Sequence, residues 1–298
     1  MLIPPKRIAM SGGGMLGLAH VGALDVLESQ GLLRCVKEYI GISAGSLVAL
    51  CICVGYTVSE MRNINNALDF RLMQNLDLET MLSFLDSYGL DNGQNFEKLL
   101  NILLRAKNLS PEITFAEFAE QFPERPQPRI FATNILSCVK QEFSVKETPT
   151  VQMKFAVLAS SCVPLLFTPV RDLSGNVFVD GALIAFSPFH HLTEEERAET
   201  LGITLRIKDI IDRSPFGEGL LAYFKRLFFS AHHHHDVAMY GTWTRNIVYL
   251  ETGNAHPFHF AATSEEKESI FQSGRKSVLE FLQFGTRSQR PARRNSFP

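Results

Sequence analysis

Residues 39–47 read YIGISAGSL, in which Ser43 stands between Gly41 and Gly45 in the pattern Gly-x-Ser-x-Gly. The apolar residues before Gly41 are typical of the end of a buried strand, and the apolar run 47–54 suits a helix. A serine on a sharp strand-to-helix turn projects its hydroxyl out of the fold, and glycines there leave no Cβ atoms in the way. The stretch predicts a nucleophile elbow centred on Ser43. Because so short a motif also occurs by chance, the neighbouring sequence must supply the rest of the site.

A glycine-rich loop precedes this elbow. The short apolar strand 8–10 runs into Ser11 and three glycines, Gly12, Gly13 and Gly14. The apolar spacing over 17–27 predicts a helix. Strand, loop, helix and second strand form a βαβ unit, which implies a parallel sheet with a right-handed crossover. The loop and the elbow both follow the carboxyl ends of strands, where open α/β sheets bind their ligands.

The remainder of the chain extends the same α/β pattern. Residues 59–128 show repeated helical spacing and read as a helical insertion or cap, which either covers one face of the sheet or moves as a lid. Short apolar strands resume after residue 128, and an amphipathic helix is expected over 265–284. We therefore expect one domain over residues 1–286, a three-layer α/β/α sandwich with a mainly parallel sheet. Arginine-rich residues 287–298 are expected to be disordered.

Bulk properties exclude several classes of protein. The 298 residues carry a net charge of −2, which argues against nucleic-acid binding driven by charge. The five cysteines lack metal-type spacing, and we expect buried free thiols in a reducing compartment and no metal site. The longest apolar run, 47–58, is too short to span a bilayer, and no signal peptide is evident. The expectation is an intracellular, cytoplasmic protein.

The loop from Gly12 to Gly17 also satisfies the dinucleotide pattern G-x-G-x-x-G. A dinucleotide site needs an acidic residue at the end of the next strand to bind the ribose, but here Glu38 precedes that strand. A cofactor is therefore not expected. The alternative is that consecutive glycine N–H groups form a concave nest, an oxyanion hole for the tetrahedral intermediate of acyl transfer.

A serine nucleophile also needs a base. The candidate histidines all follow residue 180. They are His190, His191, the run 232–235, His256 and His259, and none stands alone at a strand end. Asp180 directly follows the apolar residues 177–179 and precedes Gly181. It can project from the sheet edge as a carboxylate general base, although an Asp-Gly pair is also a common turn.

Taken together, these motifs resemble the patatin-like phospholipase family. The resemblance rests on Gly12-Gly13-Gly14 with Gly17, on Gly41-Ile42-Ser43-Ala44-Gly45, and on Asp180-Gly181-Ala182, in that order. Two further stretches, 159–167 and 132–134, resemble the small-residue helix end and the central strand of the family. The resemblance extends over about residues 6–284 and is least recognisable over 59–128.

The resemblance implies a Ser–Asp dyad, with Ser43 as nucleophile, Asp180 as base and the Gly12–Gly14 loop as oxyanion hole. It implies hydrolysis of fatty-acyl esters of phospholipids or neutral glycerolipids through an acyl-enzyme, without a cofactor. One departure is Leu16, where many members carry Arg or Lys, so a positive charge for a phosphate is missing. A transacylase, a catalytically inactive lipid-binding or scaffold protein, and a dinucleotide-binding module are the alternatives.

Access to lipid is the last expectation. Residues 216–229 are rich in phenylalanine and leucine, with Lys225 and Arg226 among them, and are apolar enough to dip into a membrane interface. The same residues also suit an ordinary core-facing helix. The arginines of residues 287–298 would add weak attraction to anionic lipid. The sequence thus predicts peripheral membrane contact as a hypothesis.

Overall fold

A computed structural model describes residues 3–73, 84–206, 219, 222–224, 226–227, 244–253 and 255–285. Its centre is a sheet whose strands follow the order β10-β9-β1-β2-β4-β8-β7, with β5 also paired to β4. Five of these strands run parallel, as a βαβ sequence requires. They are β1 (Arg7–Met10), β2 (Glu38–Gly41), β4 (Gln127–Asn134), β9 (Thr200–Leu205) and β10 (Ile247–Leu250).

One side of the sheet is antiparallel. Strand β5 (Val139–Phe143) and strand β8 (Val177–Asp180) both run against β4, and the short β7 (Val170–Arg171) runs against β8. The last residue of β8, Asp180, is paired with Ala132 inside β4. The register matters because Gly41 of β2 is paired with Ile130 of the same strand β4. Asp180 is therefore brought level with the chain just beyond the end of β2.

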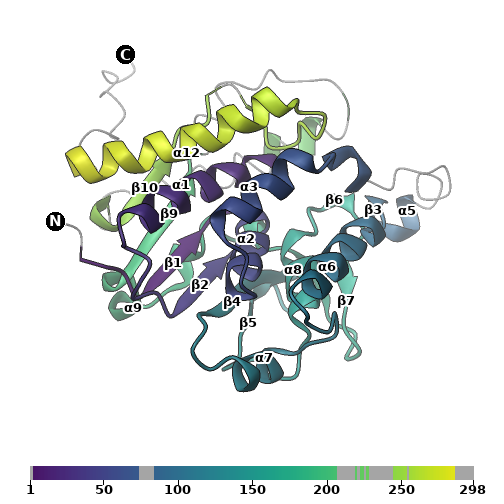
Figure 1. Cartoon of the computed structure of the whole chain (residues 1–298). Helices are drawn as coiled ribbons and strands as arrows, with labels where there is room; N and C mark the ends of the chain where they lie inside the picture. Colours follow the sequence, from purple (N-terminus) through teal and green to yellow (C-terminus); the bar gives the residue numbers. More distant parts are fainter. Residues whose placement is uncertain are drawn as a thin grey trace, which may run out of the picture.

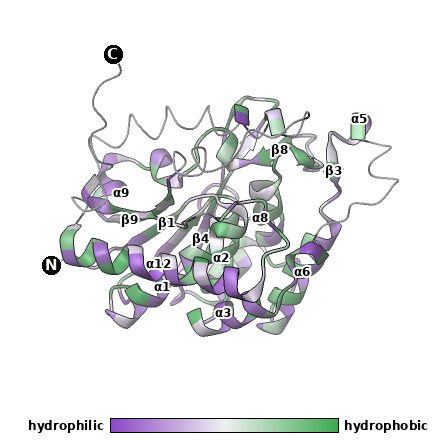
Figure 2. Ribbon diagram, turned by 90° about the horizontal axis from the view of Figure 1, so that it is seen from above, coloured by the Kyte–Doolittle hydropathy of each residue, from purple (hydrophilic) through white to green (hydrophobic). Residues whose placement is uncertain are grey.

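Helices flank this sheet (Figure 1). On one face lie α1 (Leu18–Ser29), α2 (Ala44–Cys53), α3 (Val58–Ala67), α8 (Met153–Ser161) and α12 (Ser264–Phe284). The view from above shows α9 (Glu194–Ala198) on the other side of the strands from α1 and α12 (Figure 2). The short helix η4 (Pro188–His191) packs against β1. The expected α/β fold, with a mainly parallel sheet flanked by helices, is confirmed.

The region predicted as an insertion is mainly helical. It contains α3, the short helices η2 (Phe70–Met73) and α5 (Phe84–Ser87), α6 (Gln94–Ala106) and α7 (Phe115–Gln121). It also contains one strand that the sequence did not suggest, β3 (Gly89–Asp91), which pairs in parallel with β6 (Leu165–Phe167). Helix α3 packs against α1 and α12, and α6 packs against α8. In this structure these helices cover the α/β core.

The closest helix packing lies between α1 and α12. A Cβ atom at Gly22 would lie 1.9 Å from the Phe271 carbonyl oxygen, and one at Gly274 would lie 2.0 Å from the Ala19 carbonyl oxygen. Each helix therefore presents a glycine to the backbone of the other. Helix α12 begins with a capping box between Thr263 and Glu266, so the helix starts where the side chains can satisfy its first N–H groups.

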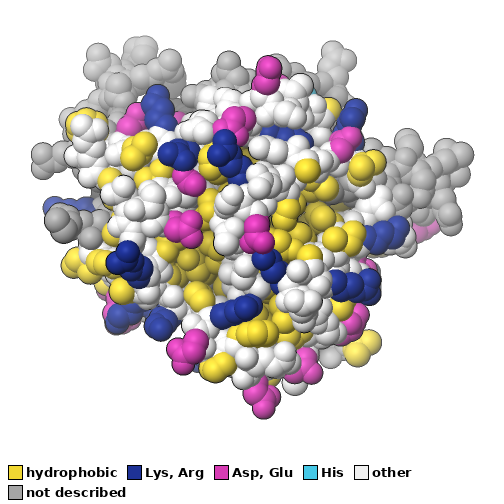
Figure 3. Space-filling model, in the orientation of Figure 1, with side chains coloured by type: hydrophobic (Ala, Val, Ile, Leu, Met, Phe, Trp, Pro, Cys, Tyr) yellow, Lys and Arg dark blue, Asp and Glu magenta, His cyan; other side chains and the backbone are white. Residues whose placement is uncertain are grey.

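The surface carries charges of both signs. On the face formed by α12, α3 and α6, lysine and arginine are interspersed with acidic side chains, and apolar side chains show between them (Figure 3). All five cysteines are free, but only Cys51, Cys53 and Cys162 are buried, whereas Cys35 and Cys138 are exposed. The expectation that the thiols are buried is therefore wrong for two of them. Within the described residues, no helix has the length and apolar character needed to cross a membrane.

Most of the predicted interfacial segment, 216–229, and all of the tail 287–298 lie outside the described residues. Of the segment, Phe224 packs against the core, whereas Tyr223 is 54% and Leu227 50% exposed. The described part therefore has both a core-facing side and an apolar side open to solvent.

Candidate active site

The predicted elbow is a sharp turn between β2 and α2. Strand β2 ends at Gly41, helix α2 begins at Ala44, and Ser43 between them has φ 53° and ψ −122°. A positive φ is unusual for a residue with a side chain and is held only where the surroundings impose it. A Cβ at Gly41 would lie 2.4 Å from the backbone of Gly45, and one at Gly45 would lie 2.3 Å from the Met10 carbonyl oxygen. Both glycines are needed for the turn to form.

Two buried serines hold the elbow. The Ser43 N–H donates to Ser160 Oγ over 2.8 Å, and Ser160 Oγ donates to the Phe131 carbonyl oxygen in β4 over 2.6 Å. On the other side, Ser46 Oγ donates to the Ser43 carbonyl oxygen over 2.6 Å. Ser46 and Ser160 are both fully buried. The strained backbone of Ser43 is thus tied to α8, β4 and the first turn of α2.

Asp180 lies beside Ser43. Both residues line the same cavity, and the Asp180 Oδ1 accepts the Ala182 N–H over 2.8 Å. Only 1% of Asp180 is exposed, and this burial raises the pKa of its carboxyl to about 7, although the nearby Ser43 side chain and the Ala182 N–H act in the opposite direction. Asp180 is the last residue of β8, and its pairing with Ala132 places it level with Ser43, just beyond the end of β2. Strand β8 runs antiparallel to β4, a strand direction that the sequence did not predict.

The glycine loop lines the same cavity as Ser43. The Gly12 N–H donates to the Phe186 carbonyl oxygen over 3.0 Å, and the Met15 N–H donates to the Pro257 carbonyl oxygen over 2.8 Å. Neither Gly13 nor Gly14 has an N–H acceptor among the described residues, and both line the cavity that contains Ser43. Of the three glycines predicted as donors, Gly12 already donates its N–H to the Phe186 carbonyl oxygen. Gly13 and Gly14 are the two left to receive negative charge.

A histidine that the sequence analysis passed over supports this loop. His20, in α1, is fully buried and its Nε2–H donates to the Ser11 carbonyl oxygen over 2.9 Å. Ser11 Oγ in turn donates to the Gly12 carbonyl oxygen. Burial lowers the pKa of His20 to about 4, so the ring is neutral at physiological pH. A histidine within a helical apolar pattern gave no signal of this contact.

The predicted histidine alternatives lie elsewhere. His190 and His191 are in η4, where His191 packs against the Phe131 ring at 4.8 Å, and His256 and His259 lie in the segment before α12. Residues 232–235 lie outside the described residues. None of the described histidines lines the cavity that contains Ser43. The described structure offers Asp180, and no described histidine, as a base beside Ser43.

The cavity above Ser43 is almost entirely apolar. Its volume is about 120 Å³, and the polar side chains on its surface are Ser43, Asp180 and Ser161. Leu16, the residue at the position where the resemblance led us to expect a cation, is fully buried and does not line the cavity. The apolar walls come from segments far apart in sequence, namely Leu47, Phe70, Phe96, Val163, Phe167, Phe186, Phe258 and Phe260. None of these side chains was predicted to line a cavity.

Comparisons with known proteins identify the family and the fold. The family model described as patatin-like phospholipase matches residues 8–193. A probable lipid hydrolase, 463L of Invertebrate iridescent virus 6, is 29% identical over 178 residues, which cover 60% of this chain and 60% of the viral protein.

Two solved structures share the fold. VipD from Legionella pneumophila matches 94% of this chain and 67% of its own, with a TM-score of 0.58 and 16% identity. Human GIVD cytosolic phospholipase A2 matches 96% of this chain and 60% of its own, with a TM-score of 0.50 and 11% identity. Since the family model covers more than half of the chain and includes the glycine loop, the elbow and Asp180, this protein belongs to the patatin-like phospholipase family.

Proposed function

We propose that this protein is a serine lipid acyl hydrolase that cleaves fatty-acyl esters of glycerolipids through an acyl-enzyme on Ser43. The observation that carries the proposal is that Ser43, held in a strained turn, and the buried carboxylate of Asp180 meet in one cavity. A base whose pKa lies near the working pH is suited to remove a proton and to return it later. The family membership and the viral lipid hydrolase relative support the same reaction class.

The proposed reaction has two halves. In the first, the Asp180 carboxylate takes the Ser43 hydroxyl proton while Ser43 Oγ attacks the ester carbonyl carbon. The oxyanion that forms is stabilised by the N–H groups of Gly13 and Gly14, and each such donor is typically worth about 3 kcal/mol of the barrier. Asp180 then returns the proton to the leaving alcohol oxygen. In the second half, water replaces the alcohol and releases the fatty acid by the same steps.

The apolar cavity favours a fatty-acyl group over a small polar acyl group. Six phenylalanine side chains of the described residues line it, and burying methylene groups against them stabilises the complex by about 0.8 kcal/mol each. Both phospholipids and neutral glycerolipids are candidates. The cavity is assigned to the acyl chain, and the polar part of either lipid lies on the other side of the ester bond. An alcohol in place of water would make the enzyme a transacylase. Peripheral membrane contact through residues 216–229 remains part of the proposal.

A fluorophosphonate probe tests the nucleophile. Such probes phosphonylate activated serines, so the wild-type chain should become labelled and the Ser43→Ala variant should not. The Asp180→Asn variant should keep the fold, because the change in volume is small, and should lose at least about a hundredfold in hydrolysis of phospholipid and triacylglycerol. Equal labelling of wild type and Ser43→Ala would refute Ser43 as the nucleophile. Binding of lipid without labelling or turnover would instead favour the inactive lipid-binding alternative.

A further inference from the structure

A second cavity lies beside the one that contains Ser43. It has a volume of about 290 Å³ and lies between the start of α6, helix α8 and strand β7. Three residues line both cavities: Phe96 of α6, Ser161 at the end of α8, and Phe167 at the end of β6. We call these three residues the partition, the cavity with Ser43 the acyl cavity, and its neighbour the second cavity.

Two aromatic rings make up the bulk of the partition. Phe96 is 8% exposed and belongs to the amphipathic α6, which packs on α8. Phe167 is brought to it by the pairing of β6 with β3, in which Phe167 is opposite Asp91. Ser161 adds little, because its side chain is much smaller than the two phenyl rings. The separation of the two cavities therefore depends mainly on the side chains of Phe96 and Phe167.

The far side of the partition is not closed to an apolar chain. Phe155 and Leu158 of α8 and Val170 of β7 line the second cavity, alongside the polar Lys154 and Arg171. Lys154 is already paired with Glu97, at 3.2 Å between Nζ and Oε1. An acyl chain that passed the partition would thus meet apolar side chains on one wall. In the present structure the two rings stand in its way.

We infer that Phe96 and Phe167 set the upper length of the acyl chain that the enzyme accepts. The inference rests on the proposed function, since it assigns the acyl cavity to the fatty-acyl group attached to Ser43. A chain that just fills the acyl cavity binds well, and each methylene beyond that has to displace a ring or remain in water. Removing one ring joins the two cavities and gives a longer chain a place to bind.

Binding of two neutral esters tests this without turnover. In a Ser43→Ala background, the affinities of methyl decanoate and methyl myristate are measured by titration calorimetry, with and without the further change Phe96→Ala. The added space should improve the affinity for methyl myristate relative to methyl decanoate by at least about tenfold. The matched control is Leu158→Ala, which enlarges the second cavity but leaves the partition in place and should not alter the ratio.

Thermal unfolding of each variant establishes that it is folded, and Phe96→Leu with Phe167→Leu provide milder openings if Phe96→Ala does not fold. An unchanged affinity ratio in a folded variant with the partition opened would overturn the inference, as would failure of both esters to bind. The proposed function fails separately: wild type would then show no Ser43-dependent cleavage of any ester, whatever the binding ratio.

Discussion

Burial of Asp180 has opposite effects on the stability of the fold and on the proposed chemistry. Folding raises the pKa of its carboxyl from the ordinary 3.8 to about 7, because the group is removed from water. A raised folded-state pKa means that the native state holds the proton more tightly than the unfolded chain does. Stability associated with Asp180 is therefore full below about pH 4 and is lost as the pH rises toward 7. The buried base is thus obtained at the expense of stability.

The pH dependence of hydrolysis follows from the same shift. Only the ionised Asp180 can accept the Ser43 proton, so kcat/KM for a soluble ester such as p-nitrophenyl butyrate should rise about tenfold per pH unit and level off above about pH 7. Initial rates between about pH 5 and pH 9 measure this. Asp180→Asn should retain at most a small rate without that inflection. A flat wild-type profile over the whole range would count against Asp180 as the base.

At the scale of elements, hydrogen bonds at the elbow connect α2, α8 and β4. Ser160 on α8 connects the backbone of Ser43, before α2, to the backbone of Phe131 in β4. Its neighbour Ser161 is also on α8, but its buried Oγ has no hydrogen-bond partner among the described residues. The two adjacent serines therefore differ in what their hydroxyl groups do.

This difference gives a matched pair of variants. Ser160→Ala leaves the buried Ser43 N–H and the Phe131 carbonyl without their partner, so we expect a loss of about 1–3 kcal/mol in the free energy of unfolding. Ser161→Ala removes a hydroxyl that makes no hydrogen bond and should be neutral or slightly stabilising. Urea unfolding of both variants measures the two effects. Equal stabilities for the two variants would contradict a stabilising role of the Ser160 hydrogen bonds. Fluorophosphonate labelling should also be slower in Ser160→Ala, because the strained turn relaxes.

Much of the secondary structure around the elbow is determined by residues adjacent in sequence and was predicted. The strand ending at Gly41, the turn at Ser43 and the helix after it depend on residues adjacent in sequence, and they form where expected. Strand β3 and its pairing with β6 were not predicted. A three-residue strand has too little pattern to be distinguished from a loop, and its partner lies more than seventy residues later. Its stability comes from that long-range pairing.

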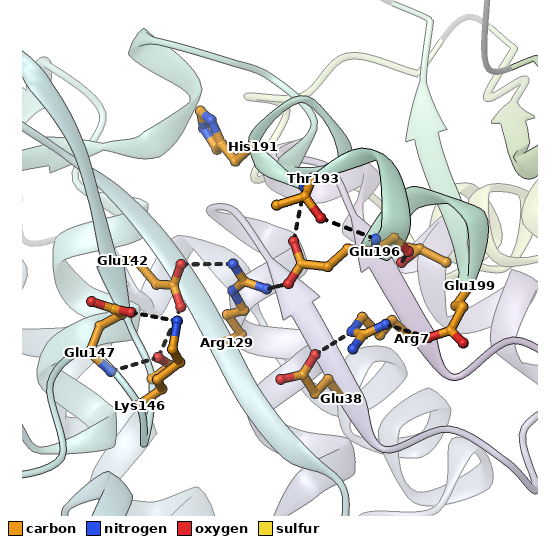
Figure 4. A network of polar contacts seen from close by, with 12 residues as sticks. Arg7, Glu38, Arg129, Glu142, Lys146, Glu147, His191, Thr193, Glu196 and Glu199 are labelled. Atoms are coloured by element: carbon orange, nitrogen blue, oxygen red, sulfur yellow. Dashed lines mark hydrogen bonds and ion pairs between the residues drawn. The ribbon is translucent and has the colours of Figure 1, made fainter.

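At the scale of the whole molecule, ion pairs join the strands of the sheet to one another and to α9 (Figure 4). Arg129 of β4 contacts Glu142 of β5 at 2.8 Å and Glu196 of α9 at 2.6 Å, and its side chain is only 13% exposed. Nearby, Arg7 of β1 contacts Glu38 of β2 at 2.7 Å. Residues from five elements thus take part in these two groups of ion pairs.

Arg129→Met should therefore destabilise the fold in a pH-dependent way. Removing the cation leaves two partly buried carboxylates without their partner, and we expect a loss of about 3–5 kcal/mol near neutral pH. Burial raises the pKa of Glu196, but its hydrogen bonds with Thr193 and Arg129 outweigh this and lower it overall. A lowered pKa gives stability that is present above the unfolded value and lost as the pH falls. The difference from wild type should therefore shrink below about pH 4.5.

Urea unfolding at neutral and acid pH measures this difference. Arg171→Met is the control, because Arg171 is exposed and makes no ion pair with any described residue, and its effect should stay within about 0.5 kcal/mol at either pH. A destabilisation of Arg129→Met that did not change with pH would point to lost packing of the arginine stem rather than to unpaired carboxylates.

The sequence by itself determined the parts of this protein whose geometry is local. A strand, a glycine-bounded serine and a helix can adopt only a narrow set of backbone angles, so the elbow and the glycine loop could be read from adjacent residues. The identity of Asp180 also came from sequence, through its place among these motifs. The antiparallel direction of its strand β8 did not, because whether a strand runs parallel or antiparallel depends on its neighbours.

Only the tertiary structure decided how the site is enclosed. The Ser160 contact and the phenyl rings of the acyl cavity come from segments that are distant in sequence. A buried phenylalanine or serine shows the same one-letter pattern whether it fills the core or lines a cavity. Which of the two it does depends on the packing of every element around it, and that packing is a property of the folded chain as a whole.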